Sequence, residues 1–288
     1  MTATHEAVEQ VARQHLPIGV AEKWIPLLRP AARLKPHDSG DSIVGQLGGV
    51  PTLQDDVAWP EWKHHGPLAF IASVDCRELT ALGLDIALPR DGTLAFFYFD
   101  GEYDDGKSSV IFEEPESLAG SRVLYVPADA TAKARSSPGG ITAYPRVDLS
   151  AKAVATYPNF EHPSLIDAFR VAGEDLRSFL DHPVNDLGFM EALGELDTGP
   201  AHQVGGYARP VQGPVEYEVA LATLGGKTAR EHPSLSREAR AWTLLVQIDS
   251  DDDAKMMWGD VGTLYWMMRH GDLMARSFDA ASFTWQRS

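Results

Sequence analysis

Short runs of apolar residues, each bounded by glycine, proline or charged residues, dominate the chain after residue 66. Runs of this length that contain aromatic and β-branched residues are typical of buried β-strands. They predict strands at 67–75, 92–100, 110–113, 122–127, 141–149, 242–249, 262–268 and 282–286. The segment 129–140 is small, polar and ends in Pro-Gly-Gly, which predicts an exposed loop.

Apolar residues spaced by three and four positions predict helices in the rest of the chain. The opening segment carries one such face, made of Val8, Val11, Ala12 and Leu16. The clearest pattern, at 164–181, begins with a capping box of Ser164 and Asp167 and continues with Leu165, Phe169, Ala172, Leu176 and Phe179. A further helix is predicted at 215–226, ending at Gly225-Gly226. Pro26 and Pro30 exclude a long helix over 24–34.

Several of these patterns occur twice, in the same order. The sequence Gln-x-Gly-Gly stands at 46–49 and at 203–206, each followed by an apolar strand that ends in Asp (Asp75 and Asp249) and then by a Gly-Thr-Leu strand. We therefore predict a β-rich α+β fold in which two degenerate tandem repeats share a core, with peripheral helices. The predicted division is an N-terminal helical segment at 1–40 and one domain at 41–288, with repeats at about 41–150 and 200–288 and a helical connection at about 160–200.

Composition narrows the class of protein. The 288 residues carry a formal net charge of -16, and 44% of them are hydrophobic, which is enough for a sizeable core. A surface this acidic repels nucleic acid and anionic membranes and suits a basic protein partner. The single cysteine, Cys76, excludes internal disulfides and thiolate zinc clusters. With no signal-like or membrane-spanning run of apolar residues, the expected location is the cytoplasm.

A set of ordered motifs resembles a known family. The motifs are GGVPTLQDDVAWP, GPLAFIASVDCREL and LPRDGTLAFFYFD in the first half, and HQVGGYARPVQGP, WTLLVQIDSD and WGDVGTLYWMM in the second. From about residue 40 to the C-terminus the chain is similar to the YwqG-like family, domain of unknown function 1963. The resemblance implies an α+β fold with an internal duplication and no established activity. Members of this family usually carry Gln where this chain has Ser73, whereas the second half keeps Gln247.

The glycine pairs Gly48-Gly49 and Gly205-Gly206 do not have the spacing of nucleotide-binding loops. We interpret them as structural corners, because glycine supplies positive φ and close backbone approach. The acidic run 249–253 has Ala254 where a calcium loop needs glycine, so a solvated loop is expected and no metal or cofactor is predicted.

Signatures of a catalytic nucleophile are missing from the sequence, and Asp75 beside Cys76 should raise the pKa of the thiol. The first hypothesis is therefore a non-catalytic protein-binding or regulatory module, for example an immunity protein. The alternative is an enzyme or small-ligand-binding protein with a cleft between the repeats. That cleft would be lined by His202, Gln212, Gln247, Asp249 and Asp75, together with Trp59 or Trp258. For His202 we favour a structural role in which it holds a loop through backbone hydrogen bonds.

Overall fold

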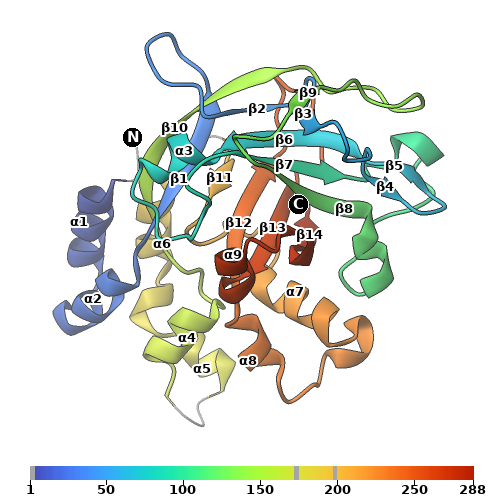
Figure 1. Ribbon diagram of the computed structural model, residues 1–288. Helices are drawn as coiled ribbons and strands as arrows, with labels where there is room; N and C mark the ends of the chain where they lie inside the picture. Colours follow the sequence, from blue (N-terminus) through green and yellow to red (C-terminus); the bar gives the residue numbers. More distant parts are fainter. Residues whose placement is uncertain (1–3, 172–174, 197–199) are drawn as a thin grey trace.

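One large sheet organises the protein in the computed structural model, which describes residues 4–171, 175–196 and 200–288 (Figure 1). Every strand in this sheet pairs antiparallel with its neighbours. From one edge to the other the order is β14 (Ser282–Gln286), β13 (Thr263–Arg269), β12 (Trp242–Asp249), β11 (Gln203–Val204), β1 (Arg29–Pro36), β10 (Val147–Thr156), β2 (Gly45–Leu47), β6 (Ala69–Asp75), β7 (Thr93–Tyr98) and β8 (Ser121–Val126). The chain is thus α+β with a predominantly antiparallel sheet.

The sheet order is symmetric about its central pair, β1 and β10. Moving outwards, β11 and β2 occupy equivalent places, followed by β12 and β6, β13 and β7, and β14 and β8. Two smaller antiparallel pairs lie beside the first half, β3 (Thr52–Gln54) with β9 (Ala132–Ala134) and β4 (Glu61–Trp62) with β5 (Gly66–Pro67). The strands predicted at 67–75, 92–100, 122–127, 242–249, 262–268 and 282–286 are all present.

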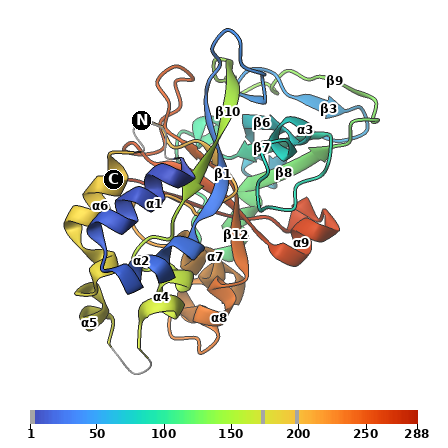
Figure 2. The ribbon, with the colours of Figure 1, turned by 90° about the vertical axis from the view of Figure 1, so that its left-hand side faces the viewer.

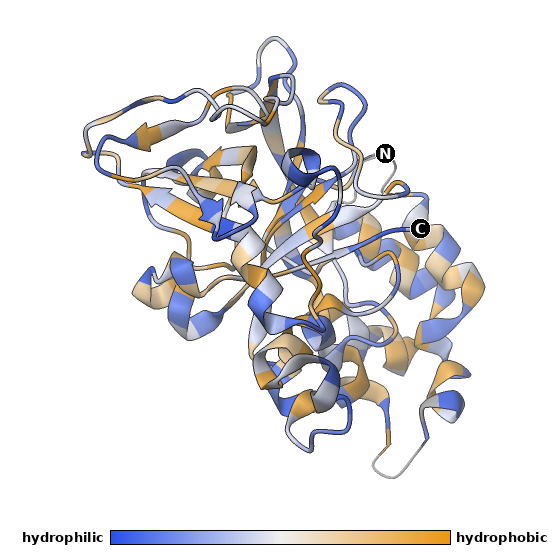
Figure 3. Ribbon diagram, turned by 90° about the vertical axis from the view of Figure 1, so that its right-hand side faces the viewer, coloured by the Kyte–Doolittle hydropathy of each residue, from blue (hydrophilic) through white to orange (hydrophobic). Residues whose placement is uncertain are grey.

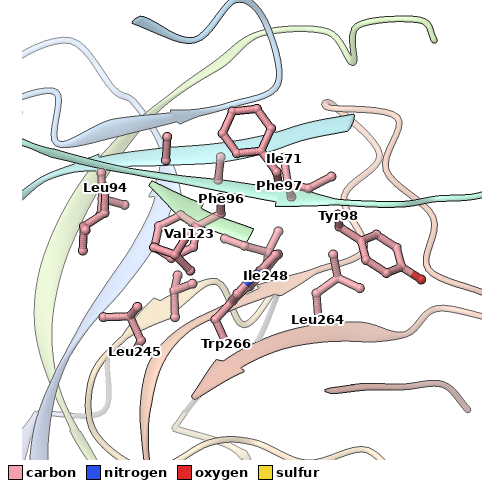
Figure 4. Close-up of a cluster of buried hydrophobic side chains, with 14 of the residues drawn as sticks. Ile71, Leu94, Phe96, Phe97, Tyr98, Val123, Leu245, Ile248, Leu264 and Trp266 are labelled. Atoms are coloured by element: carbon pink, nitrogen blue, oxygen red, sulfur yellow. The ribbon is translucent and has the colours of Figure 1, made fainter. Parts of the chain in front are cut away.

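The two outer parts of the sheet face each other and enclose the main core (Figure 4). Phe96 of β7 contacts Trp266 of β13 with ring centroids 5.3 Å apart, and Tyr98 stacks on Phe283 of β14 at 5.0 Å. Phe96, Trp266 and Phe283 are 0% exposed. Burial of such large rings dominates the energetics of a core, so these contacts are the main reason that the two halves stay together.

Helices cover the remaining apolar surfaces (Figures 1 and 2). A second core is formed by α1 (His5–His15), α2 (Ile18–Trp24), α4 (Pro163–Phe169), α5 (Leu176–Leu180) and α6 (Leu187–Gly194), where Trp24 meets Phe189 edge to face at 5.1 Å. A third core lies between β12–β13 and the pair α7 (Val215–Leu224) and α8 (Leu235–Ala239). The short helices α3 (Cys76–Thr80) and α9 (His270–Ala275) follow β6 and β13. Figure 3 shows apolar and polar residues side by side around the helices, as expected for elements with one buried face.

Several sequence predictions require correction. The helix expected at 164–181 is two short helices, α4 and α5, and Ala172 lies outside the described residues. Leu165 and Phe169 of α4 and Phe179 of α5 are buried in the same core, so these residues reach it without one continuous helix. The N-cap of α4 is His162, whose Nδ1 accepts the N–H of Ser164, and not the expected Ser164.

Strand predictions failed where side chains or prolines intervene. The segment 110–113 is not a strand, because Ser117 hydrogen-bonds both backbone groups of Ile111 and Trp285 donates to the carbonyl of Val110. Segment 1–40, expected to be helical, contributes the central strand β1 as well as α1 and α2. Pro30 is tolerated in β1 because β11 pairs only with Ala32 and Arg33, which leaves the early part of the strand with one neighbour. The strand predicted at 141–149 begins at Val147 and continues to Thr156.

Across the described part of the chain, every helix is too short or too polar to cross a membrane.

Candidate functional site

The two Gln-Gly-Gly corners adopt the same backbone geometry. We call residues 46–49 corner 1 and residues 203–206 corner 2. In each corner the side-chain Nε2 of the glutamine donates to the carbonyls two and four residues further on, at 2.7 and 3.4 Å from Gln46 and at 2.8 Å for both bonds of Gln203. All four glycines have left-handed φ values between 53° and 72°. The corners are therefore closed by an internal amide, and their glycines adopt a backbone conformation that other residues rarely take.

Each corner is also fastened to a β-bulge in the neighbouring strand. The register of β6 against β7 shifts at Ile71, and that of β12 against β13 shifts at Leu245. The first glycine of each corner donates its N–H to the carbonyl of the bulged residue, Gly48 to Ile71 at 2.8 Å and Gly205 to Leu245 at 3.2 Å. A bulge leaves one residue outside the ladder, so the glycine N–H satisfies a carbonyl that would otherwise lack a partner.

His202 stands immediately before corner 2 and is 0% exposed. Its Nδ1 accepts the backbone N–H of Asp249 at 3.0 Å, so Nε2 carries the proton and donates to Asp251 at 3.1 Å. This hydrogen bond is the main cause that lowers the pKa of Asp251. His202 thus holds a loop, but the loop is the acidic segment after β12 and not the glycine corner itself.

Gln247 and Trp258 complete a buried polar cluster with His202. The amide of Gln247 is fully buried, donating to the carbonyl of Ala201 at 2.6 Å and accepting the N–H of Arg209 at 2.9 Å. The indole of Trp258 is 3% exposed and donates to the carbonyl of Asp249 at 3.2 Å. Of the residues predicted in the second half, His202, Gln247 and Trp258 come together, but their polar atoms hydrogen-bond within the interior of the protein.

Asp249 joins the same cluster through its carboxylate. Its Oδ2 accepts the N–H of Ala201 at 2.9 Å, and its Oδ1 accepts the hydroxyl of Thr263 at 2.7 Å. The neighbouring Asp251 uses Oδ1 to accept the N–H of Ala254 at 2.7 Å. These carboxylates organise the turn after β12. Among the residues that the structure describes, no group of three or more His, Cys, Asp or Glu side chains is arranged to hold a metal ion.

The remaining predicted residues lie elsewhere. Asp75 caps α3, where its Oδ1 accepts the N–H groups of Arg77 and Glu78 at 2.8 and 3.2 Å. Trp59 packs edge to face on Phe97 at 5.4 Å and donates to a backbone carbonyl. The backbone N–H of Gln212 donates to Gln286, and the segment around it borders a surface hollow of about 270 Å³. Burial, together with Asp75, raises the pKa of the Cys76 thiol to about 12, in line with an inert cysteine.

The surface of the cluster is the loop 250–262, which we call the acidic loop. Its inward residues are buried and its outward residues are exposed in near alternation. The outward set consists of Asp252, Asp253, Lys255, Met257, Gly259, Asp260 and Val261. Met257 and Val261 are 54% and 57% exposed. Because Asp251 and Met256 exchange two backbone hydrogen bonds of 2.8 Å, the loop presents three carboxylates and two large apolar side chains on a held backbone.

Sequence reasoning missed a buried carboxylate and a partly buried one on α7, Glu216 and Glu218. Glu216 is 3% exposed and lies 3.5 Å from Nε2 of His162. Burial raises the pKa of Glu218 to about 7, although Thr284 and Gln286 hydrogen-bond its carboxylate. The signal available was Glu at alternate positions within an otherwise apolar helix, Val215–Leu224, where a polar residue must face either solvent or a buried partner.

Comparison with models of protein families matches residues 45–286 to a domain of unknown function, DUF1963. The match covers most of the chain, so this protein belongs to the DUF1963 family, as the motifs indicated. No curated protein matches the chain.

Proposed function

We propose that this DUF1963 member is a non-catalytic regulatory module, for example of the immunity type, that binds a partner protein with a basic surface. The observation that carries the proposal is the use of its polar residues. His202 and Gln247, which a catalytic cleft would have to expose, are 0% exposed and spend their hydrogen bonds on the backbone and on Asp251. What they support is an outward-facing acidic loop. Polar residues that are buried and hydrogen-bonded in this way favour a binding surface over a catalytic site.

The acidic loop is the docking surface in this proposal. It carries the exposed carboxylates Asp252, Asp253 and Asp260 and the exposed apolar side chains Met257 and Val261. Apolar side chains supply affinity in protein interfaces, whereas charges at the rim chiefly supply orientation and association rate. A loop that is already held by internal hydrogen bonds loses little conformational entropy on binding. The net charge of -16 would steer a basic partner from a distance.

Two matched triple variants test the proposal. Asp252→Asn, Asp253→Asn and Asp260→Asn neutralise the acidic loop; Glu6→Gln, Glu22→Gln and Glu191→Gln remove the same charge from exposed helix positions. Each changes the formal net charge from -16 to -13. Used as baits in lysate at low and high salt, the wild type and the helix triple should capture the same basic protein. The loop triple should lose roughly tenfold or more of it.

Capture that is equal for the two triple variants would contradict docking at the acidic loop. Failure to capture any protein at low salt would contradict the binding function as a whole. Because both variants carry the same net charge, a difference between them reports position and not overall charge.

We also propose that the two halves descend from an internal duplication. Supporting this are the symmetric strand order and the two corners, with the same glutamine hydrogen bonds and the same bulge contact. The alternative function, a ligand cleft between the halves, is less favoured because aromatic pairs such as Phe96 and Trp266 fill the space between the facing strands. A cytoplasmic location is part of the proposal and is supported by the lone buried Cys76.

A further inference from the structure

A small polar cavity of about 90 Å³ lies beside corner 2, away from the acidic loop. Its walls come from β1, the start of α4, the segment after corner 2, the first turn of α7, and the α8–β12 connection. The side chains that carry its chemistry are Arg29, His162, Tyr207, Glu216 and Arg240. A buried water occupies about 10–15 Å³ on this measure, so the cavity has room for a molecule of several heavy atoms.

Glu216 gives one side of the cavity a negative charge that lacks a full partner. The residue is 3% exposed, and its carboxylate lies 3.5 Å from Nε2 of His162. Nδ1 of His162 accepts the N–H of Ser164 at 3.0 Å, so this imidazole caps α4 as the neutral tautomer with its proton on Nε2. Within the described residues, no lysine or arginine forms an ion pair with Glu216. A buried carboxylate with only a neutral neighbour favours a cation.

Two arginines, each paired with an aspartate, also line the cavity. Nε of Arg29 pairs with Asp85 at 2.6 Å, its Nη1 lies 3.4 Å from the hydroxyl of Thr243, and its guanidinium stands 5.4 Å from the ring centroid of Tyr207. Arg240 pairs with Asp167. The side chains of Arg29 and Arg240 are 29% and 41% exposed, so both reach the solvent. A guanidinium with an open N–H edge is suited to an anionic acid group.

We propose that this cavity binds a small zwitterion, an α-amino acid with a short side chain, with its ammonium group against Glu216 and its carboxylate toward Arg29. The two charges of such a ligand match the separated charges of the cavity. The volume restricts the ligand to the size of glycine or alanine. The site goes beyond the proposed partner binding and does not depend on it, since none of its residues belongs to the acidic loop.

Calorimetry and thermal melting with glycine and L-alanine at millimolar concentrations test the site. Methylammonium and acetate serve as single-charge probes, and L-tryptophan serves as the probe that is too large. Glycine or alanine should bind and raise Tm, the single-charge probes should bind at least about tenfold more weakly, and tryptophan should not bind. Equal binding of methylammonium would overturn the zwitterion, and no heat or Tm shift with either amino acid would mean a cavity filled by water only.

Matched variants on one helix locate the binding. Glu216→Gln removes the charge with little change of shape and should weaken glycine binding at least about tenfold. Glu218→Gln removes a carboxylate two residues away that does not line the cavity, and should bind glycine like the wild type. Arg29→Lys provides a second lining variant if Glu216→Gln does not fold. Amino-acid binding that survives both lining variants would place the ligand elsewhere and overturn the proposal.

Discussion

Corner 1 and corner 2 share a backbone scaffold but differ in the side chains beside it. Corner 1 is preceded by Gly45, where a Cβ would lie 2.1 Å from the carbonyl oxygen of Ser73. Corner 2 is preceded by His202, which is accommodated because β11 begins one residue later, at Gln203. Opposite the two glutamines, the neighbouring strands carry Ser73 and Gln247. The two corners therefore share the glutamine and the two glycines, whereas the residues before and opposite them differ.

The largest expected effect comes from the first glycine of each corner. An Ala at Gly48 would place its Cβ 2.4 Å from the carbonyl oxygen of Pro145, a backbone atom that cannot yield. At Gly205 the nearest atom is the end of the Ile86 side chain, at 3.0 Å. Both variants incur about 1–2 kcal/mol for positive φ. We expect Gly48→Ala to lose about 3–5 kcal/mol of unfolding free energy in urea and Gly205→Ala about 1–2 kcal/mol.

Gly83→Ala is the control for that pair. Gly83 has a φ of 68°, and a Cβ there would have nothing within 4 Å. The unfolding free energy lost by Gly83→Ala therefore measures the effect of the positive φ alone. If Gly48→Ala lost no more unfolding free energy than Gly83→Ala, the close approach of the backbone at Gly48 would not distinguish the two corners.

The next effect concerns the positions opposite the corners. Gln247→Ser would leave the carbonyl of Ala201 and the N–H of Arg209 without their side-chain partner, at a cost of about 2–3 kcal/mol. The reciprocal change, Ser73→Gln, occurs at a half-buried site and should alter stability by less than about 1 kcal/mol. Urea unfolding of both variants measures the asymmetry. Equal and small losses would show that Gln247 is dispensable in the second half.

The smallest effect is a pH dependence of stability that Glu218 contributes in the second half. Burial raises the pKa of Glu218 from 4.5 to about 7, so the folded protein binds a proton more tightly than the unfolded chain. Stability contributed by this group is complete below pH 4.5 and is lost as the pH rises to about 7. Glu218→Gln, whose amide reproduces the hydrogen bonds of the protonated acid to Thr284 and Gln286, should remove that loss.

We compare the unfolding free energy of Glu218→Gln with that of the wild type at two pH values. The difference should be roughly 1–2 kcal/mol more in favour of the variant at pH 8 than at pH 4.5. Unfolding free energies at several pH values give the measurement. Glu216→Gln, measured in parallel, separates this effect from general loss of a carboxylate on α7. A wild type and a Glu218→Gln variant with parallel pH profiles would contradict the raised pKa.

Much of the fold was predictable because its signals are local. Apolar runs located β6, β7, β12 and β13, and Gly225 marked the end of α7 with a φ of 115°. The failures also have local causes. At 110–113, Ser117 takes backbone bonds that a strand would use, and β1 contains prolines that usually indicate a break. The candidate site was less predictable. The sequence pointed to His202, Gln247 and Trp258, but it did not predict that their side chains are buried.

Residue order and spacing predicted most of the strands, the two Gln-Gly-Gly segments and the family, because each of these depends on neighbours in the chain. The raised pKa of Cys76 depends mainly on burial, which tertiary packing decides. Tertiary contacts decided what the polar residues do. His202 meets Asp251 across 49 positions, and Glu216 meets His162 across a cavity that five elements enclose. The spacing of residues along the chain does not indicate contacts between such distant positions. Whether a histidine or a carboxylate faces solvent, a backbone N–H or a cavity is set by which distant strands and helices pack around it.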